Sequence, residues 1–184
     1  MDKILGNLHI VLLLGLVAGL ALIFGTHGSL DANLVLRWMH VFFGILWIGL
    51  LYYFNFVQIP TMPKVPAELK PGVSKYIAPS ALFFFRWAAL LTVITGLSLA
   101  YVMGYAHEAL TFSAGYQLIG IGMWLALIMA ANVWFVIWPN QKRALGIVEA
   151  DADSKAKSAR LAMLASRTNV LLSIPMLYAM ANFS

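Results

Sequence analysis

The chain has 184 residues, of which 62% are hydrophobic and only 10% are charged, and it carries a formal net charge of +5. Soluble domains average about 45–50% apolar and about 25% charged residues, so this composition excludes an ordinary water-soluble globular domain. The sequence has no cysteine. Disulfides, thiolate metal sites, iron–sulfur clusters and covalent haem attachment through a C-x-x-C-H motif are therefore excluded.

Five apolar segments are long enough to cross a bilayer, which takes roughly 20 mostly apolar residues. In chain order they cover about residues 4–25, 33–57, 80–105, 116–138 and 161–182. This pattern predicts an all-α integral membrane bundle of five transmembrane helices that forms a single domain over residues 1–184. The first segment has the basic start of a signal peptide, but Gly25-Thr26-His27-Gly28 is a poor cleavage site, so we expect it to be retained.

Two of the connections carry local structural signals. The one from Gln58 to Pro79 is rich in proline, which predicts an ordered, partly extended loop and not a continuous helix; its prolines are Pro60, Pro63, Pro66, Pro71 and Pro79. The one before the last segment is rich in Ala, Asp and Lys between Ala150 and Arg160. There we expect a short soluble helix, capped by Asp151 or Asp153, that leads directly into the last span.

The basic residues indicate the orientation of the chain. Lysine and arginine gather in the second and fourth connections: Lys64, Lys70, Lys75, Lys142, Arg143, Lys155, Lys157 and Arg160. Because short loops rich in Lys and Arg stay in the cytoplasm, we expect a cytoplasmic N-terminus and a periplasmic C-terminus in a bacterial cytoplasmic (inner) membrane. The positive charge is thus interpreted as a topology signal, and no nucleic-acid partner is expected.

The start of the second span carries the residues that most strongly suggest a cofactor. Arg37 and His40 are three residues apart and Gly44 is four further on, so all three share one helical face, with Trp47 one turn beyond. An ionisable group in hydrocarbon is costly and by default marks a functional site. We interpret Arg37 as the partner of an acidic group, His40 as a nitrogen ligand to a metal, Gly44 as a gap and Trp47 as a wall. Non-covalently bound haem b would fit this face.

The second axial ligand is predicted from depth in the membrane. His40 and His107 both lie near the outer surface, whereas His9 is roughly 20 Å away along the membrane normal at 1.5 Å per residue. His107 is therefore the predicted partner of His40, with His27 or a methionine thioether as alternatives. A simpler interpretation is that His40 only bonds a neighbouring carbonyl and that His107 is solvated.

A second set of polar residues is expected near the cytoplasmic side. It consists of Asn55, Arg86, Asn132, Arg167 and Asn169. Amide and guanidinium groups in a low-dielectric interior need hydrogen-bond partners. This polar set would either fix the register of the helices or line a pocket for a substrate or quinone.

Several of these motifs resemble a known family. The stretch Met129–Lys142 (MAANVWFVIWPNQK) resembles a hallmark of the membrane domain of bacterial urate hydroxylases, the urate oxidase N-terminal family. The helix from Arg37 to Gly49 resembles the opening helix of that family, and further similarity lies in Arg86-Trp87 with Thr92 and Gly96, and in Asn169 with Pro175 and Met180. The family continues into a cytochrome c domain that this sequence lacks, and Thr168 and Phe183 stand where it would have histidines. More weakly, the second helix resembles HemJ-type protoporphyrinogen oxidases, which bind haem.

The sequence leaves three functions open. The first is a b-type haem protein that carries electrons or supports a membrane oxidoreductase, as the resemblance to redox proteins also implies, with cytochrome c or a respiratory complex as partner. The second is a haem-free accessory or assembly subunit of a respiratory complex, or a homo-oligomer. The third is a membrane oxidase that acts on urate or a porphyrinogen.

Overall fold

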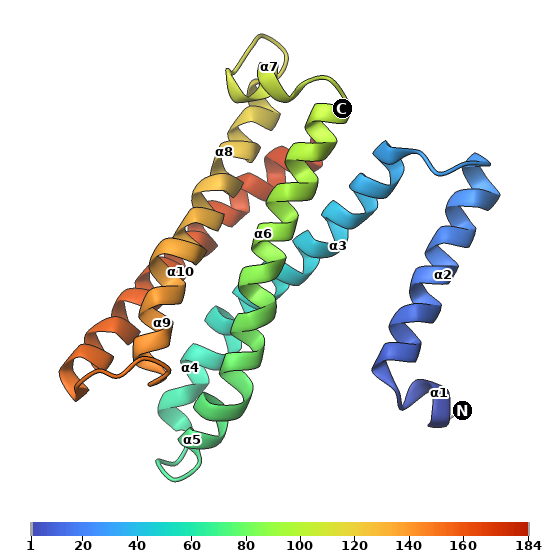
Figure 1. Ribbon diagram of the computed structural model, residues 1–184. Coiled ribbons are helices and arrows are strands. Elements are labelled where there is room, and N and C mark those ends of the chain that lie inside the picture. The colour runs from blue at the N-terminus through green and yellow to red at the C-terminus, as the bar shows by residue number, and fades with distance from the viewer. Residues whose placement is uncertain (1, 184) are drawn as a thin grey trace.

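The computed structural model describes residues 2–183 as long helices that run back and forth along one direction (Figure 1). After the short α1 (Asp2–Leu5), the long helices are α2 (Leu8–His27), α3 (Ala32–Tyr52), α6 (Ala78–Val102), α8 (Gln117–Asn132) and α10 (Ala152–Ala181). With their short continuations they form five segments long and apolar enough to cross a membrane. The predicted all-α bundle with five spans is confirmed. The described N-terminal and C-terminal ends lie at opposite ends of the molecule, but which end is cytoplasmic stays a prediction.

The proline-rich connection is more helical than the sequence analysis predicted. α3 continues through η1 (Tyr53–Gln58), α4 (Ile59–Thr61) and η2 (Met62–Lys64), and the chain becomes helical again at α5 (Lys70–Gly72), which η3 (Val73–Ile77) joins to α6. The partly extended loop predicted from Gln58 to Pro79 was therefore wrong, and only residues 65–69 separate the two helical segments.

The chain stays helical at three of its prolines, Pro60, Pro79 and Pro139, because a widened π-helical turn comes before each of them. The π-helical segments η1, η3 and η4 (Val133–Ile137) end just before Pro60, Pro79 and Pro139, which lie in the first turn of the next α-helix. In each case the residue before the proline donates its N–H to a carbonyl five residues back, as Trp138 does to Val133. A π turn separates the proline ring from the carbonyl that it would otherwise strike, so the helix continues.

The helix predicted before the last span is present, with Asp151 as its cap, and it runs directly into that span as α10. After α9 (Trp138–Ala144) the chain turns and reaches α10, whose N-cap residue is Asp151. The Asp151 carboxylate accepts hydrogen bonds from the Ser154 N–H (2.8 Å) and hydroxyl (2.7 Å). These bonds hold the pKa of the exposed Asp151 below its ordinary value. This cap therefore stabilises the start of α10 above the ordinary pKa of an aspartate and weakens as the pH falls through the lowered value.

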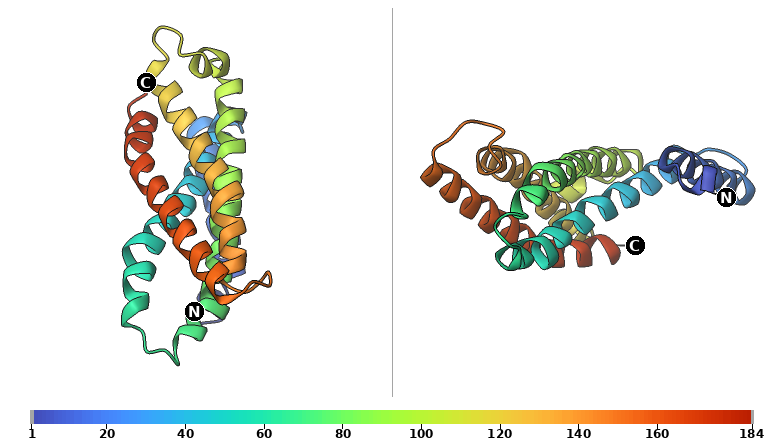
Figure 2. Two further views of the ribbon diagram at one scale, coloured as in Figure 1. Left: turned by 90° about the vertical axis from the view of Figure 1, so that its left-hand side faces the viewer. Right: turned by 90° about the horizontal axis from the view of Figure 1, so that it is seen from below.

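The core lies among α3, α6, α8 and α10, while α2 stands apart from them (Figures 1 and 2). The largest fully buried side chains come from all four of these helices and from η4: Trp47, Leu51, Phe85, Met129, Val133, Asn169 and Ser173. None of the α2 residues, all of which are described, is buried. It comes near the bundle at Gly19, where a Cβ would lie 2.6 Å from the Trp38 ring.

The predicted orientation can be tested by labelling, because the natural sequence has no cysteine. Ser113→Cys lies between α7 (Ala106–Leu110) and α8, and Glu149→Cys lies between α9 and α10, at the other end of the bundle. We expect a membrane-impermeant maleimide to label Ser113→Cys in intact cells and Glu149→Cys only after permeabilisation. The opposite labelling pattern would reverse the orientation.

Candidate functional site

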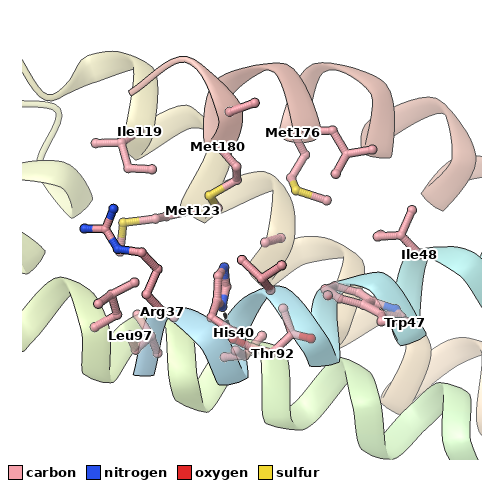
Figure 3. Close-up of a pocket in the computed structure, with 18 of the residues that line it drawn as sticks. Arg37, His40, Trp47, Ile48, Thr92, Leu97, Ile119, Met123, Met176 and Met180 are labelled. Carbon is pink, nitrogen blue, oxygen red and sulfur yellow. Dashed lines mark hydrogen bonds between the residues drawn. The ribbon is translucent and has the colours of Figure 1, made fainter. Parts of the chain in front are cut away.

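A cavity of about 700 Å³ lies between α3, α6, α8 and α10 at the end of the bundle where α3 begins. Its outer end is lined by Arg37, and its deep end by Trp47 and Ile48 (Figure 3). Tyr105 also lines the cavity. Val41 and Ile45 also line it and are 53% and 70% exposed, so the cavity opens on the surface of α3 that would face lipid. Its volume lies within the roughly 300–1,000 Å³ typical of cofactor and ligand sites.

The imidazole of His40 has a fixed orientation in this cavity. Its Nδ1 lies 2.9 Å from the Thr92 carbonyl oxygen on α6. A carbonyl only accepts, so Nδ1 must carry the proton and donate, and in the neutral ring Nε2 then holds a free lone pair. Figure 3 shows the far side of the ring pointing away from Thr92 into the cavity. A hydrogen bond from the distal ring nitrogen to a backbone carbonyl is the usual way in which a protein orients a metal-ligating histidine.

Gly96 makes room for this ring. A Cβ at Gly96 would lie 2.7 Å from His40 Cε1 and 2.9 Å from Nδ1, which is closer than side-chain atoms can pack. The backbone of α6 at Gly96 therefore lies directly against the His40 ring of α3. Thr95 adds a hydroxyl 3.5 Å from the same Nδ1. Three positions of α6, at residues 92, 95 and 96, thus define the site of one imidazole.

Arg37 lies at the outer end of the cavity and is exposed. Its guanidinium Nη2 donates a long, weak hydrogen bond of 3.5 Å to the Met103 sulfur. Nearby, Tyr105 stacks on Tyr116 and meets the edge of Phe183, so that an aromatic group covers this end. Burial raises the pKa of Tyr105, while the positive charge of Arg37 lowers it. The guanidinium of Arg37 therefore lies at the same end of the cavity as this aromatic group.

The predicted site residues divide into two sets. Arg37, His40, Gly44 and Trp47 all line the cavity, as their shared helical face implied. His107 is exposed on the short helix α7 and is not among the lining residues. The ligand pair of His40 and His107 stays a prediction, but His107 lies outside the cavity wall. His9 and His27, on α2, are also exposed.

Sequence reasoning assigned no role to several residues of the cavity. Thr92 and Gly96 were noted only as part of a family motif, and the methionines Met103, Met123, Met176 and Met180 had no assignment to a site. A depth argument could have found Gly96, because it lies near the end of α6 that is antiparallel to the start of α3. Trp47 adds a further feature: its indole Nε1 is buried and has no hydrogen-bond partner within residues 2–183.

Three of the predicted inner polar residues join helices directly. Asn132 Nδ2 donates to Asn169 Oδ1 at 2.7 Å, and Asn169 Nδ2 donates to the Met129 carbonyl at 3.0 Å, which couples α8 to α10. Asn55 Nδ2 donates to Ser166 Oγ at 2.8 Å and so couples η1 to α10. These residues do not line the cavity. Their arrangement agrees with a role in fixing helix register.

The two arginines of this predicted set lie elsewhere. Arg86 places its guanidinium carbon 3.9 Å from the centre of the Trp138 ring, a cation–π contact, and Arg167 is exposed on α10. The inner polar set is therefore an amide network, with Arg86 in a separate contact with aromatic rings.

The fold and this cavity define a multi-pass helical membrane protein with a laterally open, histidine-bearing site. Residues 108–183, from α7 to the end of α10, match a protein-family model described as "Urate oxidase N-terminal". The resemblance predicted from the Asn132 motif and from Asn169 is thereby confirmed over less than half of the chain. The Arg37–Gly49 helix precedes the matched region. No curated protein and no solved structure matches the chain.

The close approach of Gly96 to His40 makes a testable prediction about stability. We expect Gly96→Ala to destabilise the protein by about 1–3 kcal/mol, because the new methyl group must displace the imidazole or separate α3 from α6. The measurement is unfolding in detergent followed by circular dichroism. Gly15→Ala on α2 is the matched control, since nothing lies within 4 Å of its Cβ position. An equal stability for the two variants would contradict the described contact.

Proposed function

We propose that the protein is a b-type haem protein of the membrane that carries electrons or supports a membrane oxidoreductase. The observation that carries this proposal is the His40 imidazole, whose Nδ1 is held by Thr92 and whose Nε2 side faces a large cavity. Bound haem would supply an iron that gains and loses one electron. The chain's own contribution is to hold, orient and enclose that group.

The donor set supports haem over a zinc ion. No group of three or more His, Cys, Asp or Glu side chains comes together in the described part of the chain. A single imidazole among apolar and thioether side chains does not make the four-ligand shell that zinc requires. Haem brings four nitrogen ligands of its own and needs from the protein only axial ligands and a flat, apolar space. The mostly apolar wall of the cavity offers that space.

The remaining lining residues have corresponding roles in this proposal. Arg37 would exchange its weak bond to Met103 for a haem propionate, a stronger charge-assisted hydrogen bond. Gly44 has no side chain and so leaves space on the α3 side of the cavity. A Cβ at Gly44 would lie 3.9 Å from Thr92 Cγ2. The lateral opening beside Val41 and Ile45 would admit an apolar cofactor from the bilayer.

An absorption spectrum tests the proposal. We expect the purified protein to show a Soret band that changes on reduction with dithionite, and His40→Ala to lose at least most of this band. Added imidazole should restore part of the band in His40→Ala, because the variant leaves an imidazole-sized space. His9→Ala and His27→Ala, which change exposed histidines outside the cavity, are the controls and should keep it. A colourless wild-type protein without iron would overturn the proposal.

Two other functions have an observation in their favour. The separation of α2 from the core favours an accessory subunit, in which a larger respiratory complex or a second copy would pack against this helix. The family match favours an oxidase of the urate hydroxylase kind, with turnover by the purified chain as its distinguishing result. A haem-free protein that co-purifies with a respiratory complex would select the accessory role.

A further inference from the structure

Methionine sulfur is concentrated around the cavity that holds His40. Four of the nine methionines in the chain line this one cavity, namely Met103, Met123, Met176 and Met180. Met103 accepts the hydrogen bond from Arg37. The other three belong to α8 and α10, the wall opposite His40. The cavity therefore has one nitrogen donor on one side and thioether donors on the other.

The three opposing methionines differ in position along the cavity. In Figure 3 the sulfur of Met180 lies across the cavity from the end of the His40 ring that points away from Thr92. Met123 is displaced toward Arg37, and Met176 toward the deep end near Trp47 and Ile48. Of the three, Met180 is the one that a metal bound to His40 would meet on its other side.

The neighbouring helix fixes the backbone that carries Met180. A Cβ at Gly122 of α8 would lie 3.0 Å from Ala179 Cβ and 3.5 Å from Met180 Cε, so the two helices pack closely at this point. Gly122 and Ala179 are both buried. Met180 itself is partly buried and packs against the core. Its flexible thioether can adjust to a ligand while its backbone stays in place.

We propose that Met180 supplies the second axial ligand, opposite His40, an inference that rests on the proposed haem binding. Its sulfur donates a lone pair to the iron without gaining or losing a proton. His107, the ligand predicted from the sequence, is exposed on α7 outside the cavity lining. Histidine–methionine ligation gives a higher reduction potential than ligation by two histidines, because the thioether favours ferrous iron.

The test compares variants by absorption spectrum and by redox titration of the purified protein. We expect Met180→Leu to retain haem but to lose the low-spin spectrum and the thioether-to-iron charge-transfer band of the oxidised state. Met180→His should restore a six-coordinate, low-spin spectrum with a lower midpoint potential than the wild type. Met163→Leu, which lies on the same helix but outside the cavity lining, is the matched control and should keep the wild-type spectrum.

Each outcome is informative about a separate claim. If Met180→Leu keeps the wild-type spectrum and potential, the axial role of Met180 is wrong, and haem binding through His40 still stands. If His107→Ala produces the loss of the low-spin spectrum instead, the second ligand is His107. If the wild-type protein contains copper in place of iron, or no metal at all, both this inference and the proposed function are overturned.

Discussion

The hydrogen bond between His40 and the Thr92 carbonyl is the interaction on which the site depends. An imidazole inside a membrane bundle must satisfy its polar atoms locally, since no water is available there. Thr92 satisfies one ring nitrogen, and the missing side chain of Gly96 lets the ring approach α6 closely enough for this bond. The other nitrogen is left on the side of the cavity. The same contact joins α3 to α6 and sets the direction in which a ligand would be held.

The part of the site that lies on one helix was predictable from the sequence. Arg37, His40, Gly44 and Trp47 follow helical spacing, and the structure places all of them along the cavity. The part contributed by other helices was not predictable in the same way. Met123 and Met180 share no spacing with His40, and only the packing of α8 and α10 brings them to it. His107 was predicted from its depth alone; it is exposed on the short helix α7 outside the cavity lining, and its role as a ligand stays a prediction.

The fold class followed from composition and segment length, whereas the helix ends did not. Proline normally predicts the end of a helix, but Pro60, Pro79 and Pro139 each follow a π-helical turn that lets the helical path continue. No simple sequence pattern distinguishes a proline that ends a helix from one accommodated in this way. The amide network was easier to predict from the sequence. Asn132 and Asn169 lie in apolar segments, where an amide side chain needs a hydrogen-bond partner, and they bond to each other.

These features together describe a helical membrane protein with a cavity at one end of its bundle, with Arg37 at the rim and methionine sulfur across from the His40 imidazole. We propose that this cavity holds one flat, apolar group. The most direct measurement is a crystal structure of the purified protein with anomalous diffraction recorded at the iron absorption edge. This account predicts one anomalous peak at coordination distance from His40 Nε2, inside density for a planar macrocycle. A cavity filled by lipid chains, with the imidazole bonded to Thr92 alone, would contradict it.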